Sequence, residues 1–239
     1  MRTHFVPWTI DLILFSLNKS VFYIKLNKKG VKMVKTYILD TAFLRNEDIF
    51  VYFYNQLSLK GKTLVDSYKC LKDKILCLGK LVLEYIVLDQ YKLSIFDVKR
   101  DNNNKPFIEN CSYKFNISHK GRYVCLAISK FEVGIDIEVF KKVNIGIAKK
   151  LFTRKEVEYI KNSEDMNKSL ITIWSVKESV TKCVGTPKDI LFNSFEVDLS
   201  SNFVLINDKK IYYKIYYLSD YIIVTSSYIN SFRNNLFLV

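Results

Sequence analysis

The chain has 239 residues, of which 49% are hydrophobic and 15% aromatic, so it can fold around a core without disulfides. Its 37 lysines and arginines against 24 acidic residues give a formal net charge of +13, and the hydrophobic and aromatic content excludes an acidic, core-less disordered chain. The seven glycines are too widely spaced for a glycine-rich phosphate loop, and two histidines cannot build a multi-histidine metal site. Five cysteines without a C-x-x-C pattern predict a reduced, cytoplasmic protein.

Residues 1–32 differ from the rest of the chain. The apolar stretch 5–24 is interrupted by Asp11, Asn18 and Lys19, so it predicts no transmembrane helix, and no small-residue cleavage site supports a signal peptide. Residues 29–32 can be encoded by a purine-rich stretch of the kind that binds ribosomes, directly before Met33. We therefore expect that translation begins at Met33 and that 1–32 is an N-terminal extension assigned in error.

From residue 35 onward, hydrophobic periodicity predicts both strands and helices. We expect a strand at 35–41, a helix at 47–57, an amphipathic helix at 71–88 and a loop at 101–104. Two strands at 113–118 and 123–129, joined by a turn at 119–122, precede a further strand at 133–139.

The second part of the chain has a similar order of elements. Thr153 and Glu156 have the spacing of a capping box, which predicts that a helix begins there. A helix over 169–184, ended by Gly185 and Pro187, precedes expected strands at 195–199, 210–218 and 221–227. The repeated order predicts an α+β fold with two halves of similar make-up, 33–130 and 131–239.

A carboxylate pair lies on the expected strand at 133–139. Asp136 and Glu138 point to one face of that strand, with Cα atoms about 6.5–7 Å apart. Two carboxylates at this spacing can bind one hard cation, for which Mg²⁺ is the natural candidate. The alternative is a solvated strand end without a metal.

Glu178 and Lys182 lie one turn apart on the expected helix at 169–184. Glu178 can serve as a third oxygen ligand, and Lys182 can meet a phosphate group. The alternative is an ordinary ion pair between residues four apart, which contributes only about 0.3–0.5 kcal/mol.

A third cluster follows Lys105 and Pro106. Ser118 and His119 lie at a strand end, followed by Lys120, and such a turn can hold phosphate through hydroxyl, imidazole and backbone N–H groups. The alternative is a structural or solvated histidine. The neighbouring serine and histidine cannot form a hydrolase triad, because consecutive strand residues face opposite ways.

The order and spacing of these segments resemble the 4′-phosphopantetheinyl transferase superfamily, in its larger, double-domain branch that activates surfactin synthetase. The matching segments are KP at 105–106, FNISH at 115–119, GIDIE at 134–138, FTRKE at 152–156 and WSVKESVTK at 174–182. The resemblance implies a pseudo-dimer of two α+β halves that binds coenzyme A in the cleft between them. It also implies an enzyme that moves the 4′-phosphopantetheine group from coenzyme A to a serine of an acyl or peptidyl carrier protein, releasing adenosine 3′,5′-bisphosphate.

Site residues follow from the resemblance position by position. It implies that the Mg²⁺ ligands are Asp136, Glu138 and Glu178, with the metal-binding motifs in the C-terminal half. Glu178 is also implied as the base, directly or through water, and Lys182 as a contact to the pyrophosphate. Ser118 and His119 are implied as phosphate contacts, His119 to the 3′-phosphate. Lys105 and Pro106 are implied as part of the adenine-binding wall.

One departure from the family concerns the 3′-phosphate. Residues 73–76 (DKIL) lack the arginine of the family's D-x-x-R pattern, and lysines of the N-terminal half can substitute for it: Lys60, Lys62, Lys69, Lys72 and Lys74. The alternative function is a non-catalytic basic protein that binds nucleic acid or an anionic membrane. The aromatic residues follow core patterns, which disfavours that alternative. We expect a monomer with neither nucleic acid nor membrane as partner.

Overall fold

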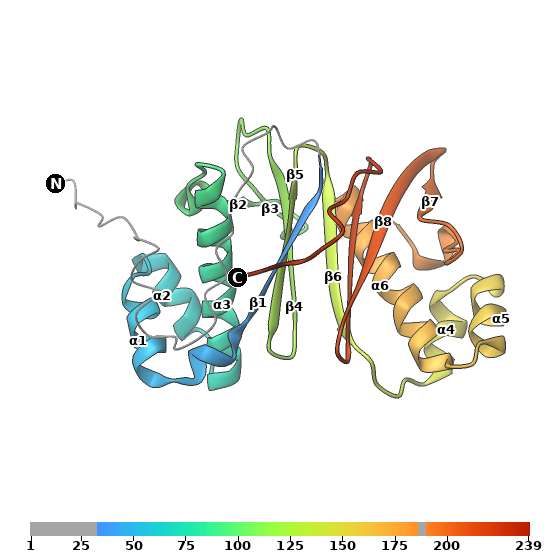
Figure 1. Ribbon diagram of the computed structural model, residues 1–239, viewed down its shortest axis with the longest axis horizontal. Coiled ribbons are helices and arrows are strands. Elements are labelled where there is room, and N and C mark those ends of the chain that lie inside the picture. The colour runs from blue at the N-terminus through green and yellow to red at the C-terminus, as the bar shows by residue number, and fades with distance from the viewer. Residues whose placement is uncertain (1–32, 186–189) are drawn as a thin grey trace.

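The computed structural model describes residues 33–185 and 190–239, so the expectations for 1–32 and for Pro187 lie outside it. Two four-stranded sheets lie face to face in the middle of the molecule, and helices cover the outer face of each sheet (Figure 1). The predicted α+β fold in two halves is therefore confirmed. No helix among the described residues is long and apolar enough to cross a membrane.

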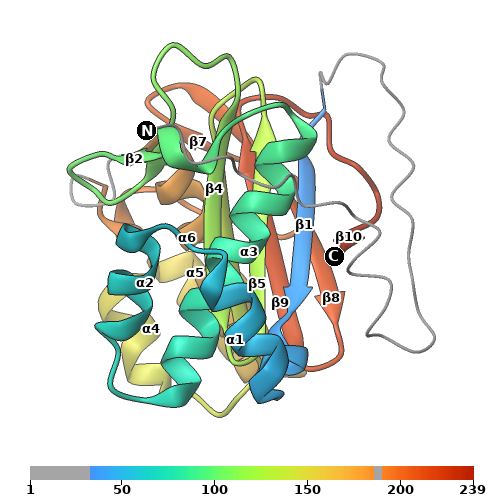
Figure 2. The ribbon, with the colours of Figure 1, turned by 90° about the vertical axis from the view of Figure 1, so that its left-hand side faces the viewer.

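The N-terminal half packs three helices on its sheet. The helices are α1 (Glu47–Asn55), α2 (Leu59–Asp66) and α3 (Leu71–Gln90), and α3 lies along the sheet (Figure 2). The sheet contains β1 (Lys35–Asp40), β4 (Lys114–Lys120) and β5 (Tyr123–Ser129) in the order β1-β5-β4. A small two-stranded ribbon lies beside it, formed by β2 (Lys99–Arg100) and β3 (Pro106–Phe107).

The C-terminal half has the same kind of architecture. Its sheet has the order β6-β9-β8-β7, from β6 (Val133–Val139), β7 (Phe203–Ile206), β8 (Lys209–Leu218) and β9 (Tyr221–Ser227). Its helices are α4 (Ile145–Leu151), α5 (Arg154–Asn162) and α6 (Met166–Val184). The last strand, β10 (Phe237–Leu238), leaves this half and pairs in parallel with β1 of the other sheet.

Strand alternation explains why the sheets have two buried faces. On β5, Val124 and Leu126 pack toward α3, whereas Cys125 and Ala127 pack toward the second sheet. Because both faces of β5 are buried, nearly all of its residues are apolar.

The same alternation on β6 decides where the carboxylate pair points. Ile135 and Ile137 lie in the apolar layer between the two sheets, so Asp136 and Glu138 face the opposite way, toward α6. Gly134 makes this packing possible, because a Cβ atom there would overlap the Ser179 carbonyl oxygen of α6. The site described below therefore depends on a close contact between one strand and one helix.

Several element boundaries differ from the prediction. His119 lies on β4 rather than in a turn, because β4 continues to Lys120 and the chain reverses at Gly121, with φ of +62°. No strand forms at 195–199: Phe195 and Val197 are buried, but the Val197 N–H donates to the Glu156 side chain instead of to a neighbouring strand. The capping box between Thr153 and Glu156 is confirmed.

Candidate functional site

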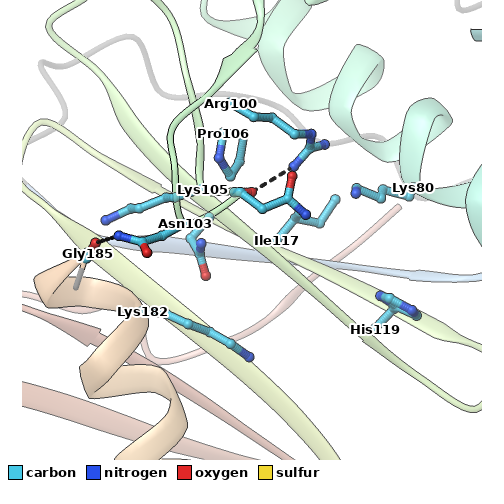
Figure 3. A pocket seen from close by; sticks show the side chains of 11 residues that line it. Lys80, Arg100, Asn103, Lys105, Pro106, Ile117, His119, Lys182 and Gly185 are labelled. Atoms are coloured by element: carbon cyan, nitrogen blue, oxygen red, sulfur yellow. Dashed lines mark hydrogen bonds between the residues drawn. The ribbon is translucent and has the colours of Figure 1, made fainter. Parts of the chain in front are cut away.

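A cavity of about 230 Å³ opens where the two halves meet. Its walls come from α3, the β2–β3 ribbon, β4 and the C-terminal end of α6 (Figure 3). The lining residues are Lys80, Arg100, Asn103, Asn104, Lys105, Pro106, Asn116, Ile117, His119, Lys182 and Gly185. Four of them carry a positive charge and none of the described lining residues is acidic, so the cavity favours an anionic ligand.

Lys182 links the cavity to the carboxylates of β6 and α6. Its Nζ atom donates to Asp136 Oδ1 at 2.7 Å and lies 3.7 Å from Glu178 Oε2. This arrangement brings together three residues that the sequence singled out from two separate segments. A lysine that touches two carboxylates at the cavity wall can exchange one of them for a ligand phosphate.

Asp136 is held in place from both sides. It is 4% exposed, and its Oδ2 atom accepts a hydrogen bond from Ser175 Oγ at 3.0 Å. Ser118 Oγ lies 3.5 Å from the Oδ1 atom of the same carboxylate. Ser118 on β4 thus contacts the carboxylate group across the junction between the halves.

Glu138 lies farther along β6 and forms its own ion pair. Its Oε2 atom is 2.7 Å from Lys120 Nζ, at the end of β4. Burial raises the pKa of Glu178, as do the charges of Asp136 and Glu138, while Lys182 lowers it. The three carboxylates therefore sense one another electrostatically, and lysines from both halves compensate their charge.

The donor set suits a hard divalent cation. Carboxylate oxygens are the ligands that Mg²⁺ prefers, and Asp136, Glu138 and Glu178 supply them from two rigid elements. Across 33–185 and 190–239, however, no three acidic, histidine or cysteine side chains are gathered into a metal-binding group. The residues fit Mg²⁺ in chemistry, with lysines as the present counter-charges of Asp136 and Glu138.

Lys105, Pro106 and His119 all line the cavity. Lys105 Nζ donates to Glu132 Oε2 at 2.8 Å and to the Cys183 carbonyl at 3.2 Å, which ties the β2–β3 ribbon to α6. Partial desolvation at the cavity wall lowers the pKa of His119, and nearby lysines lower it further, so its imidazole is neutral near pH 7.

Other cavity residues were not predicted from the sequence. Asn103 Nδ2 donates to the Gly185 carbonyl at 2.7 Å, and Asn116 Oδ1 accepts from the backbone N–H of Ile135 at 3.0 Å. Lys80 lines the cavity, whereas the five lysines weighed for the 3′-phosphate do not. The sequence does contain one signal for this part of the cavity wall: Lys80 and Glu84 lie four residues apart and therefore on one face of α3.

Comparison with known protein families assigns both halves of the chain. Residues 132–228 match the profile of the 4′-phosphopantetheinyl transferase superfamily, and residues 46–131 match the N-terminal domain of 4′-phosphopantetheinyl transferases. The chain belongs to the 4′-phosphopantetheinyl transferase superfamily. It has the two-domain organisation, because the two profiles cover consecutive segments that meet at residue 131.

Curated relatives are similar over part of their length. The 4′-phosphopantetheinyl transferases ffp and Sfp of Bacillus subtilis are each 32% identical over 127 residues, which cover 51% of this chain and 57% of theirs. The transferase gsp of Aneurinibacillus migulanus is 27% identical over 159 residues, covering 63% of this chain and 65% of its own. The chain thus spans 57 to 65% of the length of these relatives.

Proposed function

We propose that this member of the superfamily transfers the 4′-phosphopantetheine group of coenzyme A to a serine of an acyl or peptidyl carrier protein. The observation that carries the proposal is a cavity with four cations and no described acid, directly beside the Asp136–Lys182–Glu178 cluster. Coenzyme A carries a pyrophosphate and a 3′-phosphate, which match such a cavity in charge. The bacterial relatives named above are transferases of this group.

Each proposed role follows from the position of the residue. Lys105 and Pro106 form the wall proposed for adenine, and Ser118 and His119 lie on the β4 side, where phosphate contacts are proposed. Lys182 reaches the pyrophosphate from α6 and offsets the negative charge that grows on the phosphate oxygens. Bound Mg²⁺, held by Asp136, Glu138 and Glu178, would supply further stabilisation of that charge.

The reaction is a single displacement at phosphorus. The serine oxygen of the carrier bonds to the β-phosphorus, and the bond from that phosphorus to the bridging oxygen breaks, so adenosine 3′,5′-bisphosphate leaves. The serine proton passes to Glu178, directly or through water. Burial raises the pKa of Glu178, which makes its carboxylate a better acceptor near neutral pH. Lys182 keeps the charged form of Glu178 available.

The setting of the reaction follows from the rest of the chain. All five cysteines are unpaired, which fits the cytoplasm, where thiols stay reduced. We propose a monomer, because both halves of the cavity come from one chain. We propose domains at 33–130 and 131–239. Residues 237–238 belong to the second of these in sequence but pair with the sheet of the first.

The test is an intact-mass assay of an apo carrier protein incubated with coenzyme A and Mg²⁺. We expect the carrier to gain the mass of one phosphopantetheine group. Glu178→Gln should lower kcat by about 100-fold or more, since general bases contribute about 10²–10⁴. Glu158→Gln is the matched control, because Glu158 is exposed and pairs only with Arg154 among its described ion-pair partners. If several carriers gain no mass, the proposed function is wrong, and binding of nucleic acid or anionic vesicles becomes the next assay.

A further inference from the structure

A buried carboxylate lies behind the cavity and has no part in the proposed reaction. Glu84 on α3 is 2% exposed, and its Oε1 atom lies 3.5 Å from Nη2 of Arg100 on β2. Burial raises the pKa of Glu84, whereas Lys80 and Arg100 lower it. A buried carboxylate is costly to a fold unless cations compensate it, so its presence between two cavity-lining cations needs an explanation.

Lys80 is the second cation. It lies one helical turn before Glu84, so both side chains occupy the same face of α3. Burial lowers the pKa of Lys80, Glu84 raises it, and the charge of Arg100 lowers it. Without Glu84, the charges of Lys80 and Arg100 would thus lie close together in the cavity wall with no carboxylate to compensate them.

Arg100 also organises the loop that carries other cavity residues. Its Nη1 atom donates to the Asn104 carbonyl at 3.2 Å, within the turn that leads to Lys105. The contact between Glu84 and Arg100 therefore fastens the β2–β3 ribbon to α3. Figure 3 shows Lys80 and Arg100 on one side of the cavity and Lys182 on the other.

We propose that Glu84 is a positioning residue that holds Lys80 and Arg100 as a cation pair for a phosphate monoester on the side of the cavity away from Lys182. The inference rests on the proposed function, in which this group is the 3′-phosphate of coenzyme A. A phosphate monoester carries close to two negative charges, so two cations match it. His119, neutral and lining the same cavity, can add one hydrogen bond. Lys80 thereby replaces the arginine that residues 73–76 lack.

The experiment compares the binding of coenzyme A with that of dephospho-coenzyme A, which lacks only the 3′-phosphate, by calorimetry on the full chain. The readout is the ratio of the two affinities. We expect the wild type to favour coenzyme A, and Lys80→Met to lower the ratio about tenfold, the effect of one charge-assisted contact. Glu84→Gln keeps the shape of the side chain and should also lower the ratio, by about threefold or more.

Lys99→Met is the matched control, because Lys99 precedes Arg100 on β2 and pairs with Glu109 rather than lining the cavity. Its ratio should equal that of the wild type. The double variant of Lys80 and Glu84 should lower the ratio by less than the product of the single effects, because Glu84 acts partly through Lys80.

Two results would overturn the proposal. One is a Lys80→Met protein with the wild-type ratio, which is informative even if Glu84→Gln fails to fold. The other is a Glu84→Gln protein that loses affinity for both ligands equally, as a purely structural residue would. Failure of the proposed function gives a different pattern, in which the wild type distinguishes the two ligands but modifies no carrier. A wild type that binds neither ligand overturns both proposals.

Discussion

Lys177→Met should destabilise the protein strongly, although Lys177 does not line the cavity. The Lys177 side chain is fully buried, and its Nζ atom lies 2.8 Å from Glu156 Oε1. The same ammonium group donates to the carbonyls of Phe192 and Phe195, each at 2.6 Å. These contacts fasten α6 to α5 and to the segment before β7, directly beside Glu178.

The magnitude follows from what the substitution leaves behind. Methionine fills most of the volume, but Glu156 becomes a buried carboxylate without a cation, and breaking such a pair costs about 3–5 kcal/mol. Backbone N–H groups of Thr153 and Val197 still donate to Glu156, which favours the lower end of that range. With a urea m-value of about 2 kcal/mol/M, the unfolding midpoint should fall by about 1.5 M.

Urea unfolding, followed by circular dichroism and tryptophan fluorescence, measures this change. Lys155→Met is the matched control, because Lys155, also on α5, forms an exposed pair with Glu196 at 3.3 Å. Surface pairs contribute about 0–1 kcal/mol, so the control midpoint should barely move. Equal midpoints for the two variants would show that burial does not increase the contribution of the Lys177–Glu156 pair to the free energy of unfolding.

Two further predictions concern the packing and protonation of the site. Gly134→Ala should lower the unfolding midpoint and the activity together, because the new methyl group overlaps the Ser179 carbonyl and pushes α6 away from β6; an unchanged midpoint contradicts this. The pKa of His119 lies below 6.5 in the folded protein, so the unfolded state binds more protons and stability falls as pH drops through about 6.5. His119→Gln should reduce that slope in urea unfolding between pH 8 and pH 5.5, and a variant with the wild-type slope argues against it.

Local signals were predicted well from the sequence. The strand bearing Asp136 and Glu138 has the expected bounds, because alternation fixes both its extent and the direction of each side chain. The helix at Thr153 begins as expected because a capping box is satisfied within four residues. The family motifs further predicted that segments far apart in sequence contribute to one site.

Long-range contacts could not be predicted in the same way. The segment 195–199 alternates like a strand, but its backbone is used by Glu156, and no local pattern reveals that competition. Lys80 and Glu84 resemble an ordinary surface pair on a helix until the fold brings Arg100 beside them. The site residues themselves remain predictions until the variants are measured.

The pairing of β10 with β1 links the two halves in an unexpected way. Phe237 stacks on Tyr37 with ring centroids 5.0 Å apart, and Leu238 pairs with Ile38, so the edge of the first sheet is covered by residues from the far end of the second half. A split-protein reporter cut near residue 130 would therefore separate β1 from its edge strand. Its two fragments would reassemble by pairing of β10 with the edge of the first sheet as well as by docking of the sheet faces.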